Sequence, residues 1–304
     1  MRTYRYLHLD VFTDRPFEGN QLAVFPEPAG LSTDDMQRIT KEMNFSECTF
    51  IFPPEAPGTG VRMRIFTPAE ELPMAGHPTI GSTYALVHER VIAPRAAEFV
   101  FGLGVGPTPV TLDWRGDALD FVWMTQQLPS FQGRIADRPA FARAIGVSDT
   151  ELPDDLPVEI ISCGVPFLIA PIASRAAVDR LSIDRRGYRE ACIASGVKEV
   201  PLFAFTTDRA GATGDEAVYS RMLAPQFGVA EDPATGSASG PLGCYLATYG
   251  LIPQSALAHH VSLQGALMGR PSRLHISIDQ DGRRITRVRV GGRSVIVGEG
   301  RLFW

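Results

Sequence analysis

The sequence contains few cysteines and no cysteine motif. Four occur in 304 residues, and no two of them form a Cys-x-x-Cys pair. This wide spacing indicates neither a disulfide framework nor a zinc site. It suits a reducing compartment, so we expect a cytoplasmic location. The four residues are Cys48, Cys163, Cys192 and Cys244.

Long apolar runs and clusters of basic residues are also lacking. No stretch approaches the roughly 18 apolar residues of a membrane-spanning helix, and residues 1–16 lack the apolar core of a signal peptide. The net charge is -5, with lysine and arginine scattered along the chain. These absences predict no membrane segment and no nucleic-acid surface, which leaves a small molecule as the expected partner.

Enough apolar material is present for a full core. Hydrophobic residues make up 44% and charged residues 21% of the sequence, which is typical of a globular protein. A length of 304 residues suits two domains of about 150 residues each. The segment 129–157 is rich in Pro, Asp and Gly, so we expect the first domain to cover 1–128 and to end there.

Residue periodicity predicts the elements that hold the polar candidates. Apolar residues recur at helical spacing over 32–43, behind Ser32 as a cap. The segment 45–52 is apolar on both faces, which predicts a strand buried on both sides. Small and apolar residues dominate 77–90, which predicts an internal helix with Pro78 at its first position.

Two short segments of the sequence repeat each other. His77-Pro-Thr-Ile-Gly-Ser82 matches Asp232-Pro-Ala-Thr-Gly-Ser237 in three residues, at an offset of 155 (232 − 77), about half the chain. A second predicted helix, about 234–249, follows the second copy. Three identities in six residues could arise by chance, but the matching order of elements favours an internal duplication.

Helix starts of this kind can bind an anion. The first turn has unpaired N–H groups and a partial positive charge, and the neighbouring Gly and Ser allow close backbone approach. The two starts could therefore hold a substrate carboxylate between the domains, or each could simply begin a buried helix. A titratable residue at each copy, His77 or Asp232, favours the functional interpretation, although both residue types also serve as helix caps.

Glu47 is the most informative single residue, because it is a carboxylate within the apolar segment 45–52. Burying a carboxylate is unfavourable unless it is paired or faces a cleft. In a cleft, Glu47 would suit acid/base chemistry. The alternative is a structural ion pair with Arg62 or Arg64.

Longer segments around these residues match a known family. They are DVFTDRPFEGNQLAVF (10–25), MNFSECTFIF (43–52), ELPMAGHPTIGS (71–82), ISCGVPFLIAP (161–171), FGVAEDPATGSASGPLGCYL (227–246) and QGALMGRPS (264–272). Through them the chain resembles, nearly end to end, the PhzF-like proteins of the phenazine-biosynthesis isomerase type. These proteins belong to the diaminopimelate epimerase-like fold.

The resemblance implies an α+β fold of two similar halves, each a β-barrel-like sheet around a central helix. The central helices would be those that follow His77 and Asp232. The last residues, about 284–304, would return to the first half, so that the second domain covers 129–283. The resemblance also implies a homodimer.

The same resemblance implies roles for individual residues. Glu47 corresponds to the catalytic glutamate, and His77 and Asp232 correspond to the other polar residues of the active site. In the epimerase relatives two cysteines stand at about the positions of His77 and Asp232, so their absence here argues against racemisation by two thiols. The residues expected to hold or contact the substrate are Ser46, Gly76, Gly236 and Ser237.

The expected activity is therefore acid/base isomerisation of a small cyclic carboxylic acid such as trans-2,3-dihydro-3-hydroxyanthranilate, with Glu47 as proton carrier. No motif indicates a nucleotide or a metal, so we expect no cofactor. Two alternatives stay open. One is an epimerase or racemase of another small amino or hydroxy acid, and the other is a non-catalytic protein that binds small carboxylates.

Overall fold

A computed structural model describes residues 2–209, 214 and 216–304. The chain forms two compact units: unit 1 comprises Met1–Thr125 and Gly291–Trp304, and unit 2 comprises Gln126–Val290. The C-terminal residues thus belong to the same unit as the N-terminal ones. No helix among the described residues is long and apolar enough to cross a membrane.

Unit 1 is a sheet with two helices. Its strands pair in a fixed sequence: β1 is antiparallel to β18 and β2, β2 is parallel to β3, β3 is antiparallel to β4, and β4 is antiparallel to β5 and parallel to β6. β6, β7 and β8 continue the sheet with antiparallel pairing. The elements are β1 (Thr3–Val11), β2 (Asn20–Phe25), α1 (Thr33–Met43), β3 (Glu47–Phe52), β4 (Val61–Phe66), β5 (Glu71–Leu72), α2 (Gly76–His88), β6 (Glu98–Leu103), β7 (Gly106–Arg115), β8 (Ala118–Gln126) and β18 (Ser294–Phe303).

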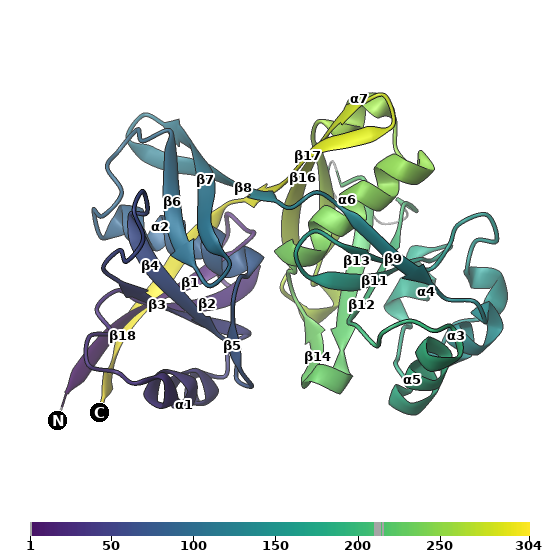
Figure 1. Cartoon of the computed structure of the whole chain (residues 1–304), viewed down its shortest axis with the longest axis horizontal. Coiled ribbons are helices and arrows are strands. Elements are labelled where there is room, and N and C mark those ends of the chain that lie inside the picture. Colours follow the sequence, from purple (N-terminus) through teal and green to yellow (C-terminus); the bar gives the residue numbers. More distant parts are fainter. Residues whose placement is uncertain (1, 210–213, 215) are drawn as a thin grey trace. The chain divides into compact units, whose positions relative to one another are not determined.

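Helix α2 is the centre of unit 1, with the strands around it (Figure 1). It contacts β1, β2, β3 and β18, and every residue of its first two turns is buried. The predicted internal helix is confirmed, but its predicted start is wrong. α2 begins at Gly76, so Pro78 is its third residue, where its missing N–H is still harmless because the first turn has no intrahelical acceptors.

Gly81 allows α2 to pack closely against β1 and β2. A Cβ atom on Gly81 would lie 2.6 Å from Leu22 Cδ2 and 2.7 Å from Val11 Cγ2, and both of these side chains are fully buried. Gly81→Val should therefore lower the free energy of unfolding by about 2 kcal/mol, because the core must shift to admit the new methyl groups. Urea denaturation would measure this. Gly298→Val, at an exposed strand position with no atom nearby, is the matched control and should change stability by less than about 0.5 kcal/mol.

Unit 2 repeats the strand pairing of unit 1. β10 is antiparallel to β9 and β11, β11 is parallel to β12, β12 is antiparallel to β13, and β13 is antiparallel to β14 and parallel to β15. β15 is antiparallel to β16. The elements are β9 (Ser130–Arg134), α3 (Arg138–Ala144), η1 (Asp149–Glu151), β10 (Glu159–Ser162), β11 (Pro166–Pro171), α4 (Arg175–Asp179), α5 (Arg185–Ala194), β12 (Leu202–Thr206), β13 (Val218–Ala224), η2 (Pro225–Phe227), β14 (Val229–Asp232), α6 (Gly236–Tyr249), α7 (Gln254–Leu257), β15 (His260–Gln264), η3 (Ala266–Met268), β16 (Ser272–Asp281) and β17 (Arg284–Gly292).

The two units are therefore similar halves, as predicted. In each unit four successive strands, β1 to β4 or β10 to β13, pair with antiparallel, then parallel, then antiparallel orientation. A short strand and a buried helix follow, and the next strand, β6 or β15, pairs in parallel with the fourth of these strands. α6 takes the place of α2 and contacts β10, β11 and β16. The positions and pairings of these strands could not be read from the six-residue repeat alone.

Unit 2 has an outer helical layer on the second face of its sheet. Residues alternate along β11: Leu168 and Ala170 pack with the side chains of α3, α4 and α5, whereas Phe167 and Ile169 pack toward α6. This alternation follows from the two-residue period of a strand. Because both faces are covered, the strand is buried from Phe167 to its end.

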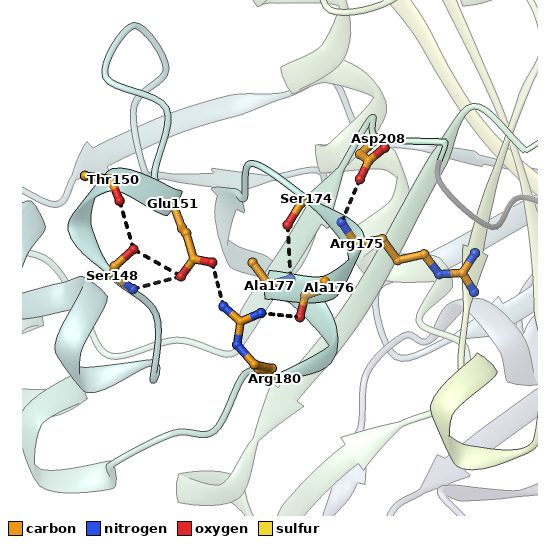
Figure 2. Close-up of polar contacts among 9 residues, drawn as sticks. All are labelled: Ser148, Thr150, Glu151, Ser174, Arg175, Ala176, Ala177, Arg180 and Asp208. Atoms are coloured by element: carbon orange, nitrogen blue, oxygen red, sulfur yellow. Dashed lines mark hydrogen bonds and ion pairs between the residues drawn. The ribbon is translucent and has the colours of Figure 1, made fainter.

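Short polar contacts hold α4 in this outer layer (Figure 2). The Ser174 hydroxyl caps the helix by accepting from the Ala177 N–H at 3.2 Å, and the Asp208 carboxylate accepts from the Arg175 N–H at 3.2 Å. At the other end, Arg180 pairs with Glu151 of η1 at 2.5 Å. The C-terminal end of α4 is thereby fixed next to the sheet, where it meets a side chain from β13.

Candidate active site

Glu47 is the first residue of β3, and its side chain is 15% exposed. Its Oε2 lies 3.2 Å from Nδ1 of His77. The two arginines suggested as alternative partners of Glu47 pair with other carboxylates. Arg62 pairs with Glu55 at 2.5 Å, and Arg64 pairs with Glu71 at 2.6 Å.

His77 is the second residue of α2 and is almost completely buried. Burial lowers the pKa of His77 to about 3 and outweighs the hydrogen bond to the Gln21 carbonyl, which acts in the opposite direction. The imidazole is therefore neutral at pH 7. Its Nε2 is buried and has no hydrogen-bond partner in the part of the chain that the structure describes.

Two oxygen acceptors lie near the same nitrogen of His77, Nδ1. The Glu47 carboxylate faces Nδ1, and the Gln21 carbonyl also accepts from the ring, while Nε2 has no partner among the described residues. The two oxygen acceptors favour the neutral tautomer with its proton on Nδ1, which presents Nε2 as an acceptor and leaves the Asn20 amide nitrogen, 3.3 Å from Nδ1, in contact without a hydrogen bond to it. A ligand that fills this site should donate a hydrogen bond to Nε2.

Asn20 also lies in this site, and the sequence analysis did not identify it. Its Nδ2 is 3.3 Å from His77 Nδ1, and the side chain is buried. It is the last residue of the segment DRPFEGN (14–20) and the first residue of β2. Its position at the end of a turn-like segment was the only signal, because a sequence separation of 57 positions from His77 hides the contact.

Asp232 is the last residue of β14 and is buried. Its Oδ2 accepts a hydrogen bond from the Thr235 hydroxyl at 2.6 Å. The three residues 233–235 connect it to the first residue of α6, Gly236. Asp232 therefore lies beside the start of the central helix of unit 2, as predicted from the sequence.

The predicted equivalence of His77 with Asp232 is wrong. Each central helix begins after a three-residue connection, with Ala75 or Thr235 as the N-cap. In each helix the fourth residue donates its hydroxyl to the N-cap carbonyl, from Thr79 to Ala75 at 2.7 Å and from Ser239 to Thr235 at 3.0 Å.

The true offset at the helices is thus 160 (236 − 76), which aligns Gly76 with Gly236 and His77 with Ser237. The two halves therefore place different chemistry at equivalent positions.

The starts of both helices are suited to binding an anion. Neither N-cap side chain, Ala75 or Thr235, accepts a hydrogen bond from its own helix, although Thr235 has a hydroxyl group. The first-turn N–H groups of α2 and α6 therefore lack their usual side-chain caps. Gly76 begins one helix, and Gly236 and Ser237 begin the other. Ser46 directly precedes β3.

The cysteines do not contribute a thiolate to either unit's site. All four are buried. Burial raises the pKa of the Cys48 thiol, next to Glu47 in the sequence, to about 12. Among the described residues no cluster of three or more His, Cys, Asp or Glu side chains could hold a metal ion.

Comparison with known proteins defines the class. A hydroxyproline epimerase from Agrobacterium vitis aligns with 99% of this chain and 92% of its own length, at a TM-score of 0.65 and 13% identity. A predicted epimerase from Pseudomonas aeruginosa aligns over 99% of both chains, at a TM-score of 0.81 and 32% identity. The fold is therefore that of the diaminopimelate epimerase-like isomerases.

The family follows from the sequence match. The model described as phenazine biosynthesis-like protein matches residues 9–300, and the chain belongs to this family. The trans-2,3-dihydro-3-hydroxyanthranilate isomerase of Pseudomonas aeruginosa is 34% identical over 301 residues, which cover 99% of each chain. Fold, family and relatives together define the protein as an isomerase.

Proposed function

We propose that the protein is a cofactor-independent isomerase that moves a proton within a small cyclic carboxylic acid, with Glu47 as proton carrier. One observation supports this most directly. The Glu47 carboxylate lies 3.2 Å from a buried, neutral His77 whose Nε2 has no partner among the described residues. A carboxylate held in this way can take a proton from carbon and return it.

The proposed substrate is trans-2,3-dihydro-3-hydroxyanthranilate or a close analogue, the compound in the name of the Pseudomonas aeruginosa relative. Its isomerisation removes a proton from C3 and adds one at C1, after which the enol becomes the ketone. The number of protons does not change, so one carboxylate that takes and returns the proton is sufficient. The amino and hydroxyl groups of this substrate are also donors of the kind that His77 Nε2 needs.

We assign binding roles to the residues at the helix starts. In unit 1 the backbone N–H of Gly76, and in unit 2 the backbone N–H groups of Gly236 and Ser237 with the Ser237 hydroxyl, would each be able to bind a carboxylate of the substrate. Asp232 would accept a hydrogen bond from a substrate amino or hydroxyl group. Ser46 would contact the substrate beside the proton carrier. A homodimer, which the family resemblance implies, and a cytoplasmic location, which the widely spaced cysteines suit, are part of this proposal.

Incubation of the purified protein with trans-2,3-dihydro-3-hydroxyanthranilate in deuterated water tests the proposal. NMR should show loss of substrate and deuterium at C1 of the product, because the proton that Glu47 takes from C3 exchanges with solvent before Glu47 returns it to C1. Failure to consume this substrate, together with deuterium entering the α-carbon of an enantiopure amino or hydroxy acid, would replace the proposal with epimerisation. Binding of small carboxylates without any exchange would make the protein a non-catalytic binder.

A further inference from the structure

The connection between β14 and α6 is fixed by a side chain that has no assigned role. Gln264, the last residue of β15, is completely buried and belongs to the segment QGALMGRPS. Its Nε2 donates to the Asp232 carbonyl at 2.7 Å and to the Thr235 hydroxyl oxygen at 3.0 Å. Its Oε1 accepts from the Thr235 N–H at 3.0 Å. One amide group therefore binds both ends of the turn that leads into the central helix.

These contacts set the direction of a chain of hydrogen bonds. A backbone N–H can only donate and a backbone carbonyl can only accept, so the orientation of the Gln264 amide is determined. The Thr235 hydroxyl accepts from Gln264 Nε2, and its single proton is donated to Asp232 Oδ2 at 2.6 Å. Without Gln264 the hydroxyl would be free to rotate, and the Asp232 carboxylate would lose the hydrogen bond that Thr235 donates to it.

The backbone after Gln264 reinforces this arrangement. Gly265 has a φ of +73°, and a Cβ atom there would lie 2.5 Å from the Pro233 carbonyl oxygen and 2.5 Å from that of Arg270. Only glycine allows this close approach at a left-handed backbone position. The turn that follows β15 is therefore pressed against the residue next to Asp232.

A second contact holds the opposite side of β14. Glu231 forms a two-point ion pair with Arg221, with distances of 2.9 and 2.7 Å. Arg221 also donates to the carbonyls of Val178 and Asp179 at the end of α4, at 2.8 and 3.0 Å. β14 is thus fixed on the side of Glu231 by an outer helix and on the side of Asp232 by Gln264, so that little freedom remains for the Asp232 backbone.

We propose that Gln264 is a positioning residue for Asp232. It acts through the Thr235 hydroxyl and the Asp232 carbonyl to fix the carboxylate and the first turn of α6. This inference rests on the proposed function, in which Asp232 and the start of α6 bind the substrate.

The test compares Gln264→Met and Thr235→Val, which keep the side-chain size but remove the hydrogen bonds, with Thr235→Ser, which keeps the hydroxyl. Ser262→Ala is the matched control. Ser262 lies on the same face of β15 as Gln264 and is also completely buried. Its replacement removes the 2.9 Å hydrogen bond between the Ser262 and Ser220 hydroxyls, which does not involve Asp232.

Gln264→Met and Thr235→Val should each lower kcat by about 10- to 100-fold, because displacement of a substrate-binding group by a fraction of an ångström disturbs the reacting geometry. The double variant should be no worse than the single ones, since both remove one chain of hydrogen bonds. Thr235→Ser and Ser262→Ala should stay within about threefold of the wild type. Retention of kcat by Gln264→Met, or an equal loss in Ser262→Ala, would overturn the proposal.

Amide hydrogen exchange separates this inference from the proposed function. Gln264→Met should increase exchange at the Thr235 amide by at least tenfold relative to Ser262→Ala, because Oε1 is the acceptor of that N–H. If the wild type does not convert the substrate, the proposed function fails while exchange still decides the role of Gln264. Unchanged protection of the Thr235 amide would then show that Gln264 does not fix this turn.

Discussion

Glu47→Gln should lower kcat by about 10²- to 10⁴-fold, which is the usual contribution of general acid/base catalysis. In the wild type, Glu47 Oε2 lies 3.2 Å from His77 Nδ1. The glutamine amide has the same size and can keep this contact, so the fold should persist. It cannot accept a proton from carbon. Steady-state kinetics with the isomerase substrate would measure the loss, and NMR in deuterated water should show that incorporation of the label falls in parallel.

Glu71→Gln is the matched control for Glu47→Gln. Glu71 is also a glutamate of unit 1 at a strand position, but it forms an ion pair with Arg64 and is 37% exposed. Its replacement should leave kcat within about twofold, because a partly exposed ion pair contributes little. Full turnover by Glu47→Gln would remove Glu47 from the mechanism. An equal loss in both variants would indicate general destabilisation instead.

The elements that hold the site were predictable where a local pattern determines them. Helix α1 begins after Ser32, whose hydroxyl accepts from the Asp35 N–H at 3.1 Å, as the cap signal indicated. β3 is buried on both faces because its sequence is apolar at consecutive positions. Glu47 was identifiable for the same reason, since a carboxylate in such a strand requires a special environment.

The partners of these residues could not be predicted, because they depend on strand pairing. Arg62 binds Glu55, and Arg64 binds Glu71. These pairings depend on the direction of each side chain and on the path of the loops. In the same way, Gln264 reaches Thr235 across 29 residues through the parallel pairing of β13 with β15. A sequence motif indicates that such residues matter, but not what they bind.

The repeat shows the limit of a short alignment. His77 and Asp232 matched because Pro, Gly and Ser recur near helix starts in both halves. The helix starts instead align Gly76 with Gly236. In this alignment Leu72, the last residue of β5, is equivalent to Asp232, the last residue of β14. One half therefore has a carboxylate at a position where the other half has an apolar residue.

Acid should destabilise both units through one buried histidine in each. Burial lowers the pKa of His77 to about 3 and that of His260 to about 4, below the ordinary value of 6.5. The unfolded chain therefore binds more protons than the folded chain at pH values below 6.5. The stability that neutral histidine provides is complete above pH 6.5 and is lost as the pH falls toward the folded-state values.

Between pH 6.5 and pH 5, each buried histidine should reduce the free energy of unfolding by about 1.5 kcal/mol, because the slope rises from about half of the limiting 1.4 kcal/mol per pH unit at pH 6.5 to nearly its full value at pH 5. When the Glu47 carboxylate, 3.2 Å from His77, is ionised, it favours the protonated imidazole. The loss of stability caused by His77 in unit 1 is therefore smaller. Urea denaturation at the two pH values would measure the loss. His260→Gln should remove the contribution of unit 2, whereas His88→Gln, at an exposed position at the end of α2, should leave the pH dependence unchanged. Equal stability of the wild type at both pH values would mean that water reaches both imidazoles and that neither is held neutral by burial.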